Sequence, residues 1–299
     1  MKTYLGIDVG GTAIKYALMN EESTILSKGE VETPKTNLED FIQTISHLYQ
    51  RHPEVSGIAM SAPGRIDANK GYMFTGGALS HYIIECPLAD LIQEKVHVPV
   101  TIDNDAKCAA SAELWKGSLQ NVDCGMVLTI GTGIGGGVVV NGKVHRGYNF
   151  ASGEVSGLPT TIHPQNDPFD VWARINSTGN LVKAYALAKK CDPKEVNGKI
   201  FFDAIQNEDA DAQKILEDFA ESFAYGLFTI QTILDTETIA IGGGISAQSI
   251  LIETIKAKLE GIFTQLTWAP QKMMKIVPCA FGNDSNLIGA LYHHLNLNA

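Results

Sequence analysis

Two segments in different halves of the chain follow the same local pattern. IDVGGT at 7–12 ends one apolar run, and TIGTGIGG at 129–136 ends another. Each predicts a strand, a tight turn and a second strand, because glycine adopts the backbone angles that tight turns require. The architecture that begins near the N-terminus is therefore expected to restart after Gly117.

The predicted elements occur in the same order in both halves. The first half has predicted strands at 3–9, 14–19 and 25–33, a helix at 37–52, a strand at 55–60, a helix near 87–97, a strand at 98–102 and a helix from about 106 to 116. The second has predicted strands at 124–130 and 136–140, a third element at GKVHRG, helices of which the longest spans about 209–235, a strand at 238–241, a helix at 247–261, a strand at 275–278 and a helix from Asp284.

This order predicts an α/β fold of two lobes, each with a βββαβαβα pattern, and a ligand-binding cleft between them. The first lobe is expected at 1–117, completed by the C-terminal helix at 284–299. The second is expected at 118–283, with an all-helical insertion.

Charge and apolar runs exclude several classes of protein. The net charge of −10 disfavours nucleic-acid and membrane partners, because both select clustered lysine and arginine. No run of about 18 apolar residues predicts a membrane span, and the strand pattern at the N-terminus leaves no room for a signal peptide. The five cysteines, Cys86, Cys108, Cys124, Cys191 and Cys279, are widely spaced, so we expect reduced thiols and a cytoplasmic location.

Glycine-rich turns follow three predicted strands, the third being GGGI at 242–245. Such turns let backbone N–H groups approach phosphate oxygens, and a threonine hydroxyl or Lys15 adds a donor. Neither a Rossmann fingerprint nor a P-loop occurs in its required context, so a dehydrogenase and a P-loop ATPase are disfavoured. Asp8 lies beside the first turn, where a carboxylate can hold Mg2+ or its waters against phosphates.

TIDNDAK at 101–107 places two carboxylates and an amide before an alanine-rich predicted helix. Asp and Asn are preferred helix N-caps, which accounts for one acidic residue here. It accounts less well for Asp-Asn-Asp. Capping and catalysis both stay open at this point.

Six motifs together are similar to those of the ROK family of sugar kinases, within the actin, hexokinase and Hsp70-like superfamily. They are IDVGGT at 7–12, SAPGRID at 61–67, IDNDAKCAASAE at 102–113, TIGTGIGGG at 129–137, SGEVSG at 152–157 and AIGGGIS at 240–246. The resemblance implies two ribonuclease H-like, actin-like ATPase lobes, ATP and Mg2+ as cofactors, a sugar substrate and a homodimer.

The resemblance also implies roles for single residues. Around the nucleotide it places Asp8, Gly10, Gly11, Thr12, Lys15, Thr132, Gly133, Gly135, Gly243 and Gly244. Around the sugar it places Gly64, Gly77, Asn104, Asp105, Glu154 and Gly157, with Asp105 as catalytic base. A carboxylate in reach of the 6-hydroxyl of a hexose can accept its proton during phosphoryl transfer.

Departures from the family pattern concern zinc and the acceptor. Many members hold zinc with a histidine and a cysteine-rich stretch, but Gly157 stands at the histidine position and residues 152–190 contain no cysteine. We therefore expect no zinc site, and we interpret His163 as an exposed loop residue. Ala173 stands where a sugar-binding glutamate is usual, in a looser alignment.

Loss of both groups predicts an open pocket on the anomeric side, suited to a β-glucoside such as cellobiose. Four aromatic residues could stack on a second ring, although each is more often packing: Tyr82, Tyr148, Phe150 and Trp172. The alternatives are an N-acetylmannosamine kinase, a glucokinase, and a non-catalytic sugar-responsive regulator. A DNA-binding repressor is disfavoured, because such members carry a helix-turn-helix before the first motif. His293-His294 is better interpreted as surface or packing than as a metal pair.

Overall fold

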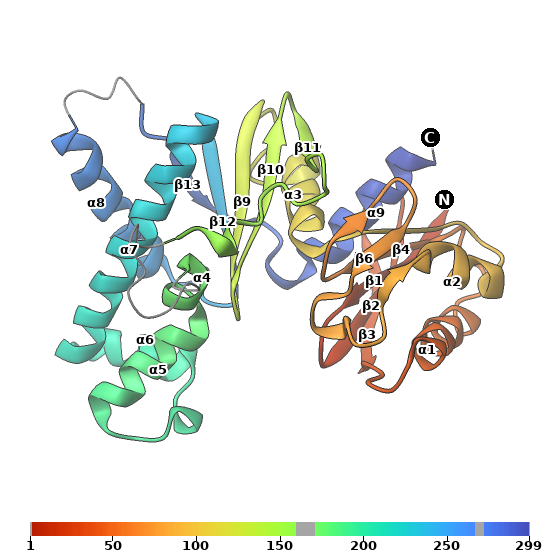
Figure 1. Ribbon diagram of the computed structural model, residues 1–299, viewed down its shortest axis with the longest axis horizontal. Coiled ribbons are helices and arrows are strands. Elements are labelled where there is room, and N and C mark those ends of the chain that lie inside the picture. Colours follow the sequence, from red (N-terminus) through yellow and green to blue (C-terminus); the bar gives the residue numbers. More distant parts are fainter. Residues whose placement is uncertain (1, 160–170, 267–271, 299) are drawn as a thin grey trace. The chain divides into compact units, whose positions relative to one another are not determined.

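The computed structural model describes residues 2–159, 171–266 and 272–298 (Figure 1). The chain divides into two compact units, each described here by itself. Unit 1 consists of Met1–Gln120, Val144–Ser152 and Asp284–Ala299, and unit 2 consists of Asn121–Lys143 and Gly153–Asn283. Val144–Ser152, inside the range expected for the second lobe, thus groups with unit 1, and the lobe boundaries drawn from the sequence stay a prediction.

Unit 1 is built on a five-stranded sheet with the order β3-β2-β1-β4-β8. Its strands are β1 (Thr3–Val9), β2 (Ala13–Asn20), β3 (Ile25–Glu32), β4 (Ile58–Ala62) and β8 (Val100–Asn104). β1 runs antiparallel to β2 and parallel to β4, which runs parallel to β8. In this register Asp8 lies beside Ser61, and Ser61 beside Asp103. Three polar side chains therefore line up across the carboxyl ends of the parallel strands.

Four helices belong to unit 1: α1 (Leu38–Gln50), α2 (Leu88–Val96), α3 (Asp105–Lys116) and α9 (Ser285–Leu297). The helix expected at 37–52 is α1, and Asn37 is its N-cap, with the Asn37 side chain accepting the backbone N–H of Asp40 at 2.9 Å. α9 packs against α3 and comes very close to it, since a Cβ built on Gly289 would lie 1.7 Å from the carbonyl oxygen of Cys108. Only glycine allows this approach.

A second, three-stranded sheet in unit 1 was not expected from the sequence. It consists of β5 (Ile66–Asp67), β6 (Tyr72–Thr75) and β7 (Ile84–Cys86), with a short 3-10 helix at Gly77–Leu79. Strands of two to four residues are too short to show a period-two pattern. The strand expected at 55–60 is also displaced to Ile58–Ala62, because Ile58 is the first residue that pairs with β8.

Unit 2 repeats the sheet order of unit 1, as β11-β10-β9-β12-β13. The strands of this sheet are β9 (Cys124–Ile130), β10 (Ile134–Val140), β11 (Lys143–His145), β12 (Thr238–Gly243) and β13 (Lys275–Pro278). Within β11, Lys143 belongs to unit 2, whereas Val144 and His145 belong to the segment that groups with unit 1. β9 is antiparallel to β10 and parallel to β12, as β1 is to β2 and β4. The duplicated α/β architecture expected from the sequence is thus confirmed.

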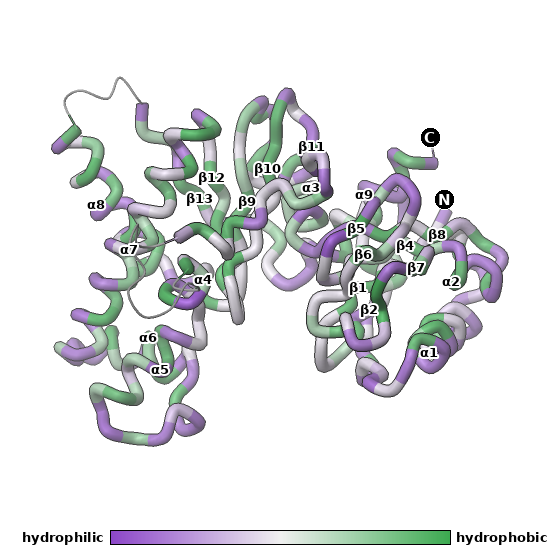
Figure 2. Tube along the Cα trace, in the orientation of Figure 1, coloured by the Kyte–Doolittle hydropathy of each residue, from purple (hydrophilic) through white to green (hydrophobic). Residues whose placement is uncertain are grey.

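The helices of unit 2 include the expected insertion between β11 and β12. They are α4 (Trp172–Ile175), α5 (Thr178–Lys189), α6 (Gly198–Gln206), α7 (Ala210–Leu234) and α8 (Ser249–Gln265), with short 3-10 turns at Val155–Gly157, Pro193–Glu195 and Gly282–Asp284. α7 packs along α8, and both show alternating polar and apolar colour in Figure 2. Trp172 is buried against Phe223 and Gly226 in the apolar core of this unit.

Candidate active site

The turn between β1 and β2 is closed by glycine. The N–H of Gly10 donates to the carbonyl oxygen of Ala13 at 3.0 Å, and a Cβ on Gly10 would lie 2.8 Å from that oxygen. Gly11 and Thr12 are exposed at the tip, and exposed Lys15 stands beside Asp8 in the β1–β2 register. The turn presents bare backbone and one ammonium group, which can donate to phosphate, next to one carboxylate, which can hold Mg2+.

A residue of α9 donates a hydrogen bond to Asp8. Its Oδ1 accepts a hydrogen bond from Nδ2 of Asn286 at 3.0 Å. Burial raises the pKa of Asp8, while the Asn286 hydrogen bond and the charge of Lys15 act in the opposite direction. The sequence offered no signal for Asn286, which lies in the first turn of a helix 278 residues away.

The β8–α3 junction answers the question raised by TIDNDAK. Asn104 is the N-cap of α3: its Oδ1 accepts the N–H groups of Ala106 at 3.1 Å and Lys107 at 3.2 Å. Asp105 is the first helical residue, and its Oδ1 accepts from Nδ2 of Asn104 at 2.9 Å. The helix N-terminus favours a negative charge at this position. Capping therefore falls to Asn104, and the half-buried carboxylate of Asp105 is positioned by the cap.

Two glycines expected at the sugar site pack beside this junction. Gly64 has φ +108° and Gly77 has φ +58°, both in the region that favours glycine. The carbonyl oxygen of Gly64 accepts Nδ2 of Asn104 at 3.0 Å, and a Cβ on Gly77 would lie 2.9 Å from Cβ of Pro63. Unit 1 thus brings Gly64, Gly77, Asn104 and Asp105 together. It also places the phosphate-type turn nearby, since a Cβ on Gly11 would lie 3.3 Å from Cβ of Ala78.

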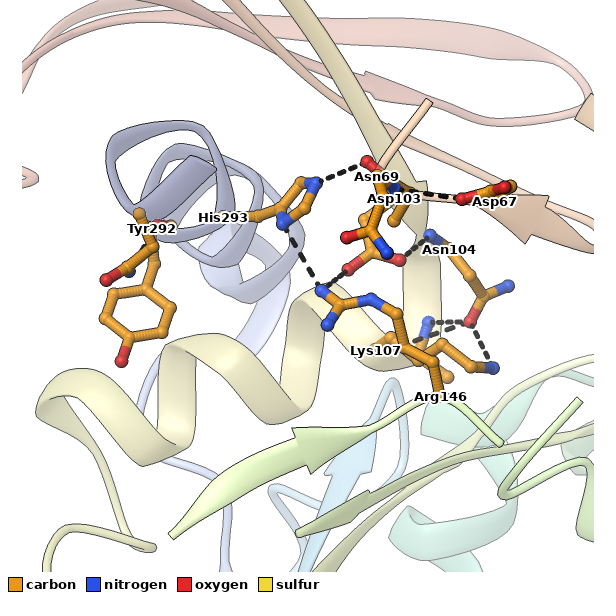
Figure 3. Close-up of polar contacts among 11 residues, drawn as sticks. Asp67, Asn69, Asp103, Asn104, Lys107, Arg146, Tyr292 and His293 are labelled. Atoms are coloured by element: carbon orange, nitrogen blue, oxygen red, sulfur yellow. Dashed lines mark hydrogen bonds and ion pairs between the residues drawn. The ribbon is translucent and has the colours of Figure 1, made fainter. Parts of the chain in front are cut away.

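An ion pair that the sequence did not reveal lies behind this junction (Figure 3). Asp103 is fully buried, and its Oδ2 lies 2.6 Å from Nη2 of Arg146. The same Nη2 lies 3.2 Å from Nδ1 of His293 on α9, and Nε2 of His293 lies 3.1 Å from the carbonyl oxygen of Ala68. Because arginine only donates, Nδ1 of His293 must accept and Nε2 must carry the proton. Burial lowers the pKa of His293, which agrees with a neutral ring.

His294, the other member of the C-terminal histidine pair, is buried as well. Its Nδ1 lies 2.9 Å from Oγ1 of Thr101 on β8, and its ring packs edge-on against Tyr4. Burial lowers the pKa of His294 to about 4, with the neighbouring His293 adding to the effect. The two histidines therefore pack inside unit 1 against different partners, so the surface interpretation is wrong for both and the packing interpretation is confirmed.

In unit 2 the β9–β10 turn carries the second set of expected phosphate ligands. Gly131 donates its N–H to the carbonyl oxygen of Gly133 at 2.9 Å and accepts the N–H of Thr178 at 2.9 Å. Thr132 is exposed at the tip. A Cβ on Gly133 would lie 3.6 Å from Oγ of Ser156 and 3.8 Å from Cβ of Ala173. The turn therefore packs beside the segment that holds Gly157 and beside α4.

A close contact between two glycines fixes the path of the chain just before Glu154. A Cβ on Gly136 would lie 2.3 Å from the carbonyl oxygen of Gly153, and one on Gly153, whose φ is +83°, would lie 2.4 Å from that of Gly136. The chain therefore passes directly against β10, where Gly135 lies, before Glu154 is reached. Glu154 and Gly157 are both exposed, and no atom of the described residues lies within 4 Å of a Cβ built on Gly157.

The third glycine turn, between β12 and α8, packs against the end of β9. Gly243 pairs with Ile130 and has φ +99°, and a Cβ there would lie 2.2 Å from the carbonyl oxygen of Ile130. Gly244 is exposed. The two glycine turns of unit 2 consequently lie at the same end of its sheet.

Metal ligation is limited within the described ranges. No group of three or more His, Cys, Asp and Glu side chains among residues 2–159, 171–266 and 272–298 is arranged to hold a metal ion. His163 lies outside these ranges, and the expectation of no zinc stays a prediction. In the same ranges no helix combines the length and the apolar composition needed to cross a membrane.

Comparison with known proteins points to one family. The model of the ROK family matches residues 4–296. The chain is 29% identical over 289 residues to a beta-glucoside kinase from Klebsiella pneumoniae, covering 96% of this chain and 94% of that protein. It is 31% identical over 312 residues to a glucokinase from Halalkalibacterium halodurans, with 96% and 93% covered. A ROK family protein from Streptococcus pneumoniae, solved in complex with sucrose, matches with a TM-score of 0.87 and 29% identity over 99% of each chain.

Proposed function

The chain belongs to the ROK family and is a carbohydrate kinase, and from this premise we propose that it transfers a phosphoryl group from ATP to the 6-hydroxyl of a β-glucoside such as cellobiose. The observation that carries the reaction type is the junction at Asn104 and Asp105. One carboxylate, at a helix N-terminus, is held by the cap residue beside two glycines of positive φ.

Asp105 acts as the base. Its carboxylate orients the 6-hydroxyl and accepts its proton as the new bond to phosphorus forms. Asn104 keeps Oδ1 of Asp105 in one direction, and the helix N-terminus stabilises the negative charge. Most of the acceleration comes from such positioning and from charge stabilisation.

The exposed glycine turns are the proposed phosphate ligands. These are Gly10, Gly11 and Thr12 with Lys15 in unit 1, and Thr132, Gly133 and Gly135 in unit 2, while Gly243 and Gly244 serve the nucleoside. Mg2+ usually takes one or two carboxylates plus phosphate oxygens and water, so the single carboxylate of Asp8 fits that role. When bound, the ion neutralises charge on the phosphates. Asp8 and Lys15 hold and orient this end of the nucleotide.

The acceptor is inferred from the space near Gly157. The position bears no side chain, and a Cβ there would meet no described atom within 4 Å. Ala173, near Gly133, offers only a methyl group. A substituent on the anomeric carbon can occupy space that a His and a Glu would otherwise fill, with Glu154 left to bind a sugar hydroxyl. The beta-glucoside kinase relative and the relative holding sucrose, a sugar linked through its anomeric carbon, support this choice.

Of the four aromatic candidates for stacking on a second ring, Tyr148 is exposed, Tyr82 and Phe150 are half-buried, and Trp172 is buried. Trp172 is 2% exposed, and Tyr82 packs on the core of unit 1 with its hydroxyl bonded to the carbonyl oxygen of Pro34. Tyr148 is 96% exposed, and Phe150 stacks on Phe74 with ring centroids 5.8 Å apart. We propose Tyr148 and Phe150 as the stacking residues.

One assay tests the acceptor. Purified protein with ATP and Mg2+ is given cellobiose, salicin, glucose and N-acetylmannosamine side by side, and phosphorylation is measured as kcat/KM. We expect the two β-glucosides to be preferred. A preference for glucose or N-acetylmannosamine would instead establish one of the alternative kinases, and no phosphorylation of any sugar would favour a non-catalytic regulator. A homodimer and the absence of zinc stay predictions, checked by light scattering and metal analysis of the same sample.

A further inference from the structure

We propose that Arg146 is a positioning residue for phosphoryl transfer, acting on Asp105 through Asp103 and Asn104. This inference rests on the proposed role of Asp105 as the base. Arg146 lies in Val144–Ser152, the segment that groups with unit 1 although the chain on both sides of it belongs to unit 2.

Asp103 is the buried member of its ion pair with Arg146. Its side chain has 0% exposure, whereas that of Arg146 has 24%. A carboxylate that is removed from water needs a compensating charge and hydrogen bonds, and removing its partner leaves a costly uncompensated group. The 2.6 Å contact between Nη2 and Oδ2 therefore determines where the Asp103 carboxylate points.

The other carboxylate oxygen of Asp103 contacts the backbone of the β8–α3 junction. Oδ1 accepts the backbone N–H of Asn104 at 2.8 Å and so orients the peptide that joins β8 to α3. The side chain of Asn104 then donates to Oδ1 of Asp105 at 2.9 Å. Three successive hydrogen bonds connect the guanidinium group to the carboxylate of the base. A shift of Arg146 is transmitted to Asp105 without any direct contact.

Arg146 is itself held by two side chains. Figure 3 shows its guanidinium group between Asp103 on β8 and His293 on α9. His293 is in turn anchored on the carbonyl oxygen of Ala68 at 3.1 Å. A lysine has one ammonium group and lacks the planar, rigid set of donors that can satisfy both partners in a fixed geometry.

A purely stabilising arginine would be expected to satisfy each of its buried donors. In the described part of the chain, however, the buried Nε of Arg146 has no hydrogen-bond partner. A buried donor without a partner lowers the free energy of unfolding. Arg146 therefore contributes less to the free energy of unfolding than a fully bonded arginine would, while its contact with Asp103 still fixes the direction of that carboxylate.

The test uses Arg146→Lys and Arg146→Met in the full chain, with the acceptor sugar that the wild type phosphorylates best. Arg146→Met leaves the Asp103 carboxylate buried without its partner and could prevent folding. The double variant Asp103→Asn/Arg146→Met removes both charges, so kcat can still be measured on a folded protein that lacks the arginine. Arg51→Met is the matched control, since Arg51 ends α1 at the surface of the same unit. All variants are assayed well below their unfolding midpoints.

We expect kcat of Arg146→Met and of the double variant to fall by about 10- to 100-fold with KM values for sugar and ATP within about 2-fold, since misplacing the base affects the transition state. We expect Arg146→Lys to recover only part of this loss, and Arg51→Met to match the wild type. A lowered unfolding midpoint with kcat unchanged would show a merely structural role and overturn the proposal, as would a loss confined to KM.

A second readout does not depend on catalysis. Amide hydrogen exchange at Asn104, Ala106 and Lys107 reports the hydrogen bonds of the junction, and we expect faster exchange in Arg146→Met than in Arg51→Met. Unchanged exchange at all three amides would refute the proposed connection. If the wild type phosphorylates no sugar, the proposed function fails, whereas the exchange result still decides whether Arg146 positions the junction.

Discussion

The side-chain amide of Asn104 donates to the carbonyl oxygen of Gly64 at 3.0 Å, although the two residues are 40 positions apart. The same amide donates to Oδ1 of Asp105 at 2.9 Å. One planar group therefore joins a turn that only glycine can form to the proposed base. The geometry of the base depends on the turn as much as on the helix.

The base role of Asp105 predicts a specific kinetic loss. Asp105→Asn keeps the shape of the side chain but removes its capacity to accept a proton, so kcat should fall by about 100- to 10,000-fold. KM for the sugar should change little, and sugar binding measured by calorimetry should persist. Asp90→Asn, at an exposed acid in the first turn of α2, is the control. Full activity of Asp105→Asn would refute the base role.

The open position at Gly157 predicts a change of acceptor. In Gly157→His/Ala173→Glu, added side chains should occupy the space assigned to the anomeric substituent. We expect the ratio of kcat/KM for cellobiose to that for glucose to fall by about 10-fold or more, the size expected when a pocket loses room for part of its ligand. Gly261→His is the control, because a Cβ at Gly261 on α8 also meets no described atom within 4 Å. An unchanged ratio would contradict the assignment of this space.

The turn at Gly64 predicts a loss of both stability and activity. A Cβ there would lie 2.1 Å from the carbonyl oxygen of Thr75, at a φ of +108°. Gly64→Ala should lower the free energy of unfolding by about 1–3 kcal/mol, measured by urea denaturation. The kcat should fall as well, because relief of the clash displaces the backbone carbonyl oxygen to which Asn104 donates. Gly261→Ala, in an open helical position, should be neutral or slightly stabilising. Equal stability of the two variants would show that the turn tolerates a side chain.

The buried ring of His294 predicts a dependence of stability on pH. Burial lowers its pKa to about 4, so between that value and the ordinary value of 6.5 the unfolded chain binds the proton and the folded chain does not. The contribution of His294 is complete above about pH 6.5 and is lost as the pH falls towards 4, on the order of 3 kcal/mol in all.

Urea denaturation at several pH values checks this. His294→Gln should show a smaller fall in the free energy of unfolding between pH 6.5 and 4 than the wild type. His47→Gln, at an exposed histidine of α1, should follow the wild type. If the free energy of unfolding of His294→Gln fell with pH as steeply as that of the wild type, the pH dependence would belong to other groups.

Much of the fold could be predicted because its signals are local. The strand ending at Val9 and the strand ending at Ile130 each show a regular apolar pattern followed by glycines, and Asn37 is followed by a helical repeat. Pattern alone places Asp105 near the start of a helix. It cannot assign the cap between neighbouring polar residues, because the choice of Asn104 depends on the contact with Gly64 from another element.

The sequence by itself determined the duplicated α/β order and the glycine turns, since strand and helix periods and tight turns are properties of consecutive residues. The candidate base came from the resemblance of its motifs to those of the ROK family. Only the tertiary structure decided that Asn286 holds Asp8, that His293 and His294 are buried, and that Arg146 neutralises Asp103. Those partners lie tens to hundreds of residues apart. Their pairing is driven by the cost of leaving a buried charge or donor without a partner, and that cost exists only once the chain has folded.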